Sequence, residues 1–518
     1  MINRRVLVRN IFSNWVNLLL GIVISFSLAP FVVHSLGNTY YGIWVIMMQF
    51  TGYLYLLDFG IREFIIRYVS KFEAERNEPE FIEVVSAGLD LYLLVALACV
   101  LITVTLAVLF PYIFDVTEEI VPVARSVALL SGAAIAQTLA LNVFSGIVMG
   151  LQRYDIFNKI GIVSSIVRLL LIVGFLGAGY GIVALAVIQL FIGFGSGLAI
   201  LLYARRLLRE RALPFRYTRS SIRNRLPMFR RLYDYSIYVL LNNVGQKAVF
   251  YTDAIVIGIF LNAAAVTFYA IAGNLIEYLR RLMLVSNNVL NPLTSELQAT
   301  RGSSSVGPVV INGARFSVLV ALPVAATFMI AGTQFISLWM GPEYTGESYP
   351  VLFVLTAITL LAIPNITITN VLYGLNRHKL VAYLRLGEAA LNLGLSILLV
   401  GYFGILGVAI GTAVPQFLLM VIILPLVIAK TVDLDLRSYI VQVYGRPAVS
   451  IAPFGTVLHL VTQTYPPGGL LVFFAEVAVC MPIYVLGVWL VGLLPDERTY
   501  GRSLAKRLWT RFAAAGHL

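Results

Sequence analysis

The sequence predicts an all-α, polytopic membrane protein of about fourteen transmembrane helices, in two pseudo-symmetric lobes of six helices each followed by a terminal pair. Three observations lead to this fold class. Of the 518 residues, 59% are hydrophobic and only 12% are charged, and the mean hydropathy of +0.89 lies far outside the soluble range. Apolar runs of about 20 residues, enough to cross a bilayer, recur along the chain. A basic segment, residues 205–231, separates two similar halves.

Each half contains six apolar runs, and two more follow the second half. The expected spans are 10–36, 41–67, 81–110, 121–151, 157–176 and 181–202, then 233–261, 266–290, 313–340, 349–373, 380–402 and 405–428, and finally 439–461 and 468–494. The first run resembles a signal peptide, but it is too long and lacks a clear small-residue cleavage site. We therefore expect a retained first span.

The loops between these runs alternate in charge. Those expected outside hold Asp115, Glu118, Glu119, Glu343 and Glu347 and no Lys or Arg. Those expected inside hold Lys71, Arg76, Arg153, Lys159, the segment 205–231, Arg301, Arg377, Lys379, Lys430 and Arg437. Cytoplasmic loops of membrane proteins are rich in Lys and Arg, so both termini are expected in the cytoplasm. The net charge of +12 then reflects orientation and attraction to anionic membrane lipids, and no nucleic-acid partner is expected.

Two short patterns suggest that the halves arose by duplication. Gly150-Leu151-Gln152-Arg153 in the first half is echoed by Gly374-Leu375-Asn376-Arg377 in the second. The expected parts are an N-lobe (1–204), an Arg-rich cytoplasmic linker (205–231), a C-lobe (232–430), spans 13 and 14 (431–494) and a basic cytoplasmic tail (495–518). The tail suits either an amphipathic helix on the inner leaflet or a solvated segment.

The first two spans carry a family resemblance, and the second lobe has comparable features. The residues are Asn14, Asn17, Pro30, Leu36-Gly37, Tyr41-Gly42 and Leu57-Asp58-Phe59-Gly60-Ile61, with Asp253 and Phe268-Tyr269 in comparable places later. Together with the organisation of the spans, they resemble the multidrug, oligosaccharidyl-lipid and polysaccharide exporter superfamily, and within it the polysaccharide transporter branch. The resemblance implies two bundles that face each other across a cavity opening alternately to either side.

Ionisable side chains inside spans are the main site candidates, because an unpaired charge there costs about 3 kcal/mol or more. In the seventh span, helical spacing puts Asn242, Gln246 and Asp253 on one face, with Asn243 and Lys247 beside it. Arg168 in the fifth span and Lys247 have no acid three or four residues away in their own helices.

Structural explanations compete with functional ones at several of these residues. Lys247 could form a cross-helix salt bridge with Asp58 or Glu277, an alternative given even weight with a role in binding. Three pairs at helical spacing would neutralise each other: Asp58 with Arg62, Glu277 with Arg281, and Arg385 with Glu388. The small-residue stripe of the first span would suit close helix packing.

The resemblance implies a flippase that moves a polyprenyl-diphosphate-linked oligosaccharide across the cytoplasmic membrane by alternating access. Its anionic diphosphate needs cations and its sugars need hydrogen-bonding groups. For the diphosphate we expect Lys247, Arg168, Arg280 and Arg281; for the sugars Asn17, Asn242, Asn243, Gln246, Tyr269 and Asn274; for coupling or structural ion pairs Asp58, Arg62, Asp253 and Glu277. The expected setting is a bacterial cell membrane, with a monomer working beside a polysaccharide polymerase or glycosyltransferases.

Two other functions are weighed against this one. A cation-coupled multidrug antiporter of the same superfamily typically has an acid in the first-lobe cavity, and the first span has none from residue 10 to 36. An integral membrane enzyme of polysaccharide assembly would need a catalytic constellation. The chain offers no loop long enough for a catalytic domain, no Gly-rich phosphate loop with its Lys and no Cys-x-x-Cys. We therefore expect no catalytic residues, no cofactor and no metal.

Overall fold

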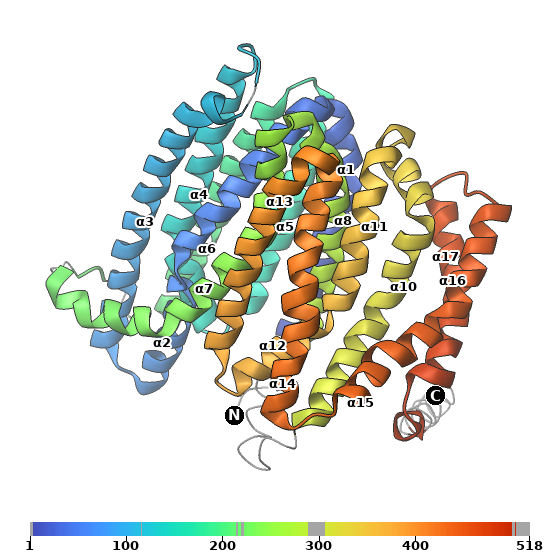
Figure 1. The fold of residues 1–518 in the computed structure, drawn as a ribbon. Helices are drawn as coiled ribbons and strands as arrows, with labels where there is room; N and C mark the ends of the chain where they lie inside the picture. Colours follow the sequence, from blue (N-terminus) through green and yellow to red (C-terminus); the bar gives the residue numbers. More distant parts are fainter. Residues whose placement is uncertain are drawn as a thin grey trace, which may run out of the picture. The chain divides into compact units, whose positions relative to one another are not determined.

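The computed structural model describes residues 4–114, 116–213, 216–218, 222–287, 306–499 and 503, and within these the side chains other than those of 4–12, 222–240 and 284–287. These ranges contain helices joined by short turns and no strands (Figure 1). The chain divides into two compact units. Unit 1 comprises residues 1–271 and 379–412, and unit 2 comprises 272–378 and 413–518. The lobe boundaries expected from the sequence stay a prediction.

Unit 1 contains the helices of the first half and parts of two later helices. They are α1 (Arg4–Leu54), the short 3₁₀ helix η1 (Tyr55–Asp58), α2 (Ile61–Glu75), α3 (Glu78–Ile113), α4 (Val121–Gly150), α5 (Tyr154–Gly177), α6 (Ile182–Glu210), α7 (Ile222–Phe260), the start of α8 (Ala263–Asn287) and most of α13 (His378–Pro415). Its core lies where α2, α3, α4 and α6 pack together.

Unit 2 contains the rest of α8 and the later helices. They are α10 (Gly307–Trp339), η3 (Pro342–Tyr344), α11 (Thr345–Ala362), α12 (Pro364–Gly374), the π-helix η4 (Gln416–Ile423), α14 (Leu424–Val432), α15 (Leu436–Ile440), the π-helix η5 (Val441–Gly445), α16 (Arg446–Thr464), α17 (Leu470–Gly487) and the π-helix η6 (Val488–Gly492). Helices α16 and α17 pack on each other and on α10.

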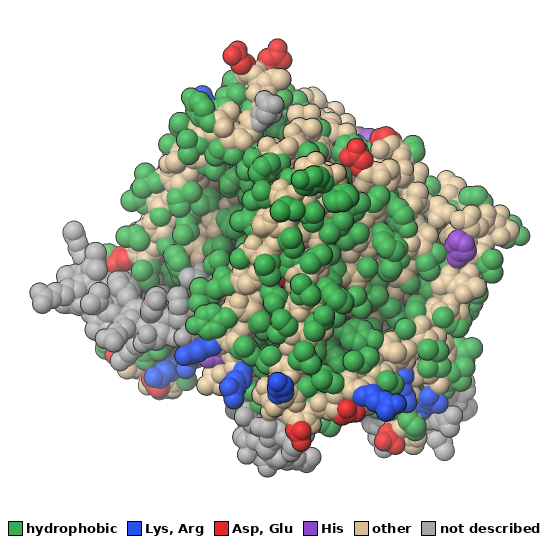
Figure 2. Space-filling view, viewed as in Figure 1, with side chains coloured by type: hydrophobic (Ala, Val, Ile, Leu, Met, Phe, Trp, Pro, Cys, Tyr) green, Lys and Arg blue, Asp and Glu red, His purple; other side chains and the backbone are tan. Residues whose placement is uncertain are grey.

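The described residues include nine helical stretches long and apolar enough to cross a membrane. Two of these are longer than one crossing needs, Ser13–Glu75 with 63 residues and His378–Val432 with 55. Each contains a glycine in the left-handed region, Gly37 with φ of 74° and Gly404 with φ of 57°, which only glycine adopts readily. Hydrophobic side chains cover the helix flanks in view (Figure 2). The protein is therefore a multi-pass membrane protein; the count of fourteen spans stays a prediction.

A break interrupts the helix of the second span. Regular helix stops at Leu54, η1 runs to Asp58, and α2 begins at Ile61. Between them Phe59 and Gly60 have φ of 47° and 75°. Left-handed backbone at a bulky residue is uncommon and is found where surrounding structure holds it. The break places the Asp58 carboxylate inside unit 1.

The two echoed sequence patterns adopt the same turn. After α4, Gln152 has φ of 61° and the Arg153 N–H donates to the Val148 carbonyl at 3.0 Å. After α12, Asn376 has φ of 57° and the Arg377 N–H donates to the Leu372 carbonyl at 2.8 Å. Both are helix ends closed by a left-handed residue and a six-to-one hydrogen bond. This shared geometry supports the duplication read from the sequence.

Charged residues tie down the helix ends near these turns. Arg153 donates to the Asp155 carboxylate at 3.0 Å, and this hydrogen bond raises the pKa of Arg153 above its ordinary value. In the Arg-rich linker, Arg211 pairs with Glu73 and the Tyr217 hydroxyl donates to Asp90 at 2.8 Å. The linker thus contacts α2 and α3. The linker arginines from Arg219 to Arg231, and nearly all of the basic tail, lie outside the residues whose side chains are described.

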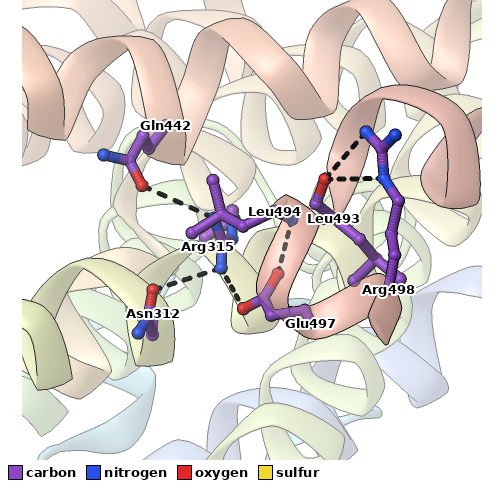
Figure 3. A network of polar contacts seen from close by, with 7 residues as sticks. All are labelled: Asn312, Arg315, Gln442, Leu493, Leu494, Glu497 and Arg498. Carbon is purple, nitrogen blue, oxygen red and sulfur yellow. Dashed lines mark hydrogen bonds and ion pairs between the residues drawn. The ribbon is translucent and has the colours of Figure 1, made fainter. Parts of the chain in front are cut away.

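A buried arginine joins three parts of unit 2 (Figure 3). Arg315 on α10 is 2% exposed, forms an ion pair with Glu497 beyond η6, and donates to Asn312 at 3.1 Å. Its other amino group reaches Gln442 on η5 at 3.5 Å. A buried charge requires such partners, and removing one leaves the other uncompensated. Arg315 therefore fixes the segment after η6 to α10.

Candidate functional site

Helix α7 presents Lys247 to the end of α1. The ammonium of Lys247 donates to the Gly52 carbonyl at 2.8 Å and lies 5.6 Å from the ring centre of Tyr55 and 5.7 Å from that of Tyr251. Both distances are within the range of cation–π attraction. The described residues place no carboxylate within ion-pair distance of Lys247. The cross-helix salt bridge between Lys247 and Asp58, considered above as a structural explanation for Lys247, is therefore not formed.

A second cation approaches the same tyrosine. Arg168 on α5 is exposed, forms no ion pair or hydrogen bond with residues in the described ranges, and is close enough to Tyr55 to interact electrostatically. Tyr55 thus lies beside both Arg168 and Lys247, at the start of the break in the second span. Lys247 and Arg168 are thus two cations without a carboxylate partner in the described residues, and both interact with Tyr55. We call the side of α7 that carries Lys247, together with its neighbours Tyr55 and Arg168, the cationic face of α7.

Asp58 has neutral partners in place of the arginine expected from the sequence. It accepts from the Tyr92 hydroxyl and from the Asn142 amide, the latter at 3.4 Å. Arg62 instead contacts Glu63 at 3.1 Å. The predicted pair of Asp58 with Arg62 was wrong because the helix is broken between them, which removes the geometry of residues four apart.

Another side of α7, rotated by about 120° from Lys247, carries a buried acid, and we call it the acidic face. Asp253 is 2% exposed and accepts from the Tyr269 hydroxyl at 2.5 Å, the Thr412 hydroxyl at 2.8 Å and the Asn392 amide at 3.5 Å. Its donors come from α8 and α13. Within the described residues no Lys or Arg pairs with it. A buried carboxylate held only by neutral donors is a candidate for binding a cation or a proton.

The structure separates the residues expected to contact sugars. Asn242 and Gln246 are half-buried and Asn243 is exposed on α7. Tyr269 is buried at 6% exposure with its hydroxyl on Asp253. The structure does not place Tyr269 to contact a sugar, because its hydroxyl is buried and already donates to Asp253. Asn17 packs against α5, where its Oδ1 lies 3.3 Å from the position that a Cβ at Gly161 would take.

Four expected site residues belong to unit 2. Glu277 pairs with Arg281 at 2.9 Å, as the spacing predicted, and also with Arg280 at 3.7 Å. Asn274 lies on the same helix, α8, and has a partner of its own. The two ion pairs of Glu277 are local to α8. The substrate roles assigned to Asn274, Arg280 and Arg281 stay predictions.

Sequence reasoning missed several partners of Asp253 and Asp58. Asn392 and Thr412 hold Asp253, and Tyr92 and Asn142 hold Asp58. They are neutral residues on helices distant in sequence, so intrahelical spacing gave no signal for them. Among the described residues, no three His, Cys, Asp or Glu side chains gather as metal ligands. The oxygen donors around Asp253 suit a hard monovalent cation better than a transition metal.

Comparison with known proteins identifies the family. A model of the polysaccharide biosynthesis protein family matches residues 7–298. The chain is 27% identical over 184 residues, 36% of its length and 39% of the relative's, to a probable low-salt glycan biosynthesis flippase, Agl15, of Haloferax volcanii. The chain therefore spans about two fifths of the length of the curated relatives that it matches.

Solved structures show the fold. The inward closed conformation of the lipid II flippase MurJ aligns with a TM-score of 0.70 and 14% identity, covering 92% of this chain and 97% of that one. An inward-facing MATE family multidrug transporter of the MOP superfamily aligns with a TM-score of 0.68 and 15% identity, over 80% and 96%. The resemblance inferred from the sequence is thereby confirmed. The family match covers more than half of the chain, so this protein belongs to the polysaccharide biosynthesis protein family.

Proposed function

We propose that the protein is a flippase that moves a polyprenyl-diphosphate-linked oligosaccharide across the cytoplasmic membrane by alternating access. The single observation that carries this proposal is the cationic face of α7. Lys247 and Arg168 both interact with Tyr55, and neither has a carboxylate partner in the described residues. A lone cation inside a membrane protein needs water or an anion. A diphosphate supplies two negative groups and binds both Lys and Arg strongly.

The rest of the proposal concerns coupling and setting. Asp253 is proposed as the coupling residue, because it is a buried acid whose recorded donors are all neutral. The protein is proposed to work as a monomer in the bacterial inner membrane with both termini cytoplasmic, beside glycosyltransferases and a polymerase. Family membership and the relative named as a probable glycan biosynthesis flippase support a membrane setting in polysaccharide biosynthesis. The translocation itself makes and breaks no covalent bond.

The test is flipping by the purified full-length protein in liposomes. A polyprenyl-diphosphate oligosaccharide is placed in one leaflet, and its arrival in the other is measured with a membrane-impermeant glycosidase. Lys247→Ala and Arg168→Ala should each lower the rate at least tenfold, since each removes one charged contact to the diphosphate. Lys247→Arg should retain part of the activity, because Arg also binds phosphate.

The matched control is Lys159→Ala. Lys159 is an exposed cation on α5, the same helix as Arg168, nine residues nearer its start. It should flip lipid at the wild-type rate. Equal loss in all three alanine variants would mean that total charge, and not the cationic face, matters. Normal flipping by Lys247→Ala would remove the proposed phosphate contact. Transport of organic cations without any flipping would favour the multidrug antiporter.

A further inference from the structure

In unit 2, the helical stretch Pro342–Gly374 is interrupted where α11 ends and α12 begins. The first residue of α12, Pro364, has no N–H, so the Leu360 carbonyl lacks the donor that would close its helical turn. The next carbonyl, that of Leu361, accepts from the Tyr444 hydroxyl of η5 at 2.8 Å. At this junction the helix therefore takes a hydrogen bond from outside itself.

Two polar side chains follow the junction on one face of α12. Asn365 and Thr369 are four residues apart, which is one helical turn, and Asn365 is 2% exposed. The Oδ1 and Nδ2 atoms of Asn365 and the Oγ1 atom of Thr369 are all buried, and within the described residues none of the three has a hydrogen-bond partner. Buried polar groups are nearly always hydrogen-bonded, and an unmet one is destabilising. These three atoms therefore require a bound partner.

The chemistry of these atoms defines the ligand. The Asn365 amide leaves both a donor and an acceptor unmet, so turning the amide over presents the same pair. A cation would satisfy Oδ1 and the Thr369 hydroxyl oxygen but would leave Nδ2 without an acceptor. An anion would fail in the reverse way, and the sequence of α12 contains no charged residue. The ligand must therefore be neutral and must both donate and accept hydrogen bonds.

We propose that Asn365 and Thr369 hold buried water at the junction of α11 and α12. Water accepts from Nδ2 and donates to Oδ1 and to the Thr369 hydroxyl oxygen, and buried water typically makes about three such hydrogen bonds. A sugar hydroxyl has the same chemistry, but a sugar ring needs an open cavity, and Asn365 is almost fully covered. The inference does not depend on the substrate proposed above.

The experiment is X-ray radiolysis of the full-length purified protein in detergent, followed by mass spectrometry. Radiolysis turns each water molecule into hydroxyl radicals, which oxidise the side chains beside it. Leu372 is 0% exposed and lies three residues from Thr369, on the same face of α12. Leu458 on α16 is also 0% exposed but belongs to an apolar cluster, so it is the matched control. Leu372 should be oxidised about fivefold faster than Leu458, because bound water lies beside it.

Thr369→Val provides an independent readout, because valine has the shape of threonine and the variant is expected to fold. If the hydroxyl binds water, its removal costs one hydrogen bond, and the unfolding temperature should fall by about 2 °C. In a dry site the same change would remove an unmet polar group and raise that temperature. Asn365→Leu should bring the oxidation of Leu372 down to the rate of Leu458. The water site is refuted if wild-type Leu372 is oxidised no faster than Leu458, or if Thr369→Val raises the unfolding temperature.

Discussion

The two faces of α7 hold opposite charges in opposite ways. On the cationic face, Lys247 touches a backbone carbonyl and two aromatic rings and remains half-buried. On the acidic face, Asp253 is buried and surrounded by three donors. A site for a large, variable anion needs open cations, whereas a site for a small cation needs a closed, pre-arranged set of oxygens. The difference fits the two roles proposed above for Lys247 and Asp253, which lie on the same helix.

The largest effect should come from disturbing the contact between α1 and the first residue of α8. A Cβ at Gly42 of α1 would lie 1.7 Å from the Ala263 carbonyl oxygen, a backbone atom that cannot turn aside. Gly42→Ala should therefore destabilise the protein by about 3 kcal/mol, seen as a lower unfolding temperature in detergent. Gly21→Ala, with nothing within 4 Å, is the matched control and should unfold at or above the wild-type temperature. Similar temperatures for the two variants would contradict this packing.

Removing the charge of Lys247 and removing the charge of Asp253 should impair different ligand responses. Asp253→Asn should abolish the dependence of flipping on sodium while the protein still binds lipid-linked oligosaccharide. Lys247→Ala should lose lipid binding while sodium still raises its unfolding temperature, because ligands stabilise the state they bind. Both are measured by thermal unfolding with and without each ligand. If either variant loses both responses, the faces do not act separately.

A smaller effect should follow from one missing donor on the acidic face. Tyr269→Phe removes the 2.5 Å hydrogen bond to Asp253 and keeps the ring. Hydrogen bonds to charged groups contribute about 2 kcal/mol, so the unfolding temperature should fall by several degrees. Tyr402→Phe, at an 80% exposed tyrosine, should leave it unchanged. An unchanged unfolding temperature of Tyr269→Phe would mean that this hydrogen bond adds no net stability.

The smallest effect should appear at the ring that both cations approach. Tyr55→Leu removes the aromatic face beside Lys247, an interaction of about 1 kcal/mol, and should lower flipping about fivefold. Tyr55→Phe keeps the ring and should stay within about twofold of wild type. The ratio of the two rates is the measurement. Equal rates would show that Tyr55 serves packing and does not help to hold the lysine.

The fold was predictable because hydropathy and charge act locally. Apolar runs of span length predicted most of the helices. The two echoed patterns predicted equivalent turns, and Gln152 and Asn376 do occupy the same left-handed position in those turns. The boundary between spans 1 and 2 was placed near the true turn at Gly37. The break after Asp58 was not foreseen, since left-handed backbone at Phe59 depends on the surrounding helices and not on its own sequence.

The candidate site was predictable only as a list of charges. Lys247, Arg168 and Asp253 stood out because charge inside a span is unfavourable. Their partners are neutral groups on other helices, such as the Gly52 carbonyl and Thr412, and sequence alone does not indicate which helices meet. The spacing of Arg385 and Glu388 did predict an ion pair, and the two side chains form it at 2.8 Å.

The ion pair of Arg315 with Glu497 has a consequence for the path of the chain through the bilayer. Two side chains in contact must lie at the same depth, and the hydrocarbon core is about 30 Å thick. The polypeptide from residue 315 to 497 must therefore return to the side from which it started. The chain between these two residues therefore crosses the membrane an even number of times. The six crossings expected from the sequence meet this condition. A single hydrogen-bonded contact thus constrains the topology of about a third of the protein without reference to hydropathy.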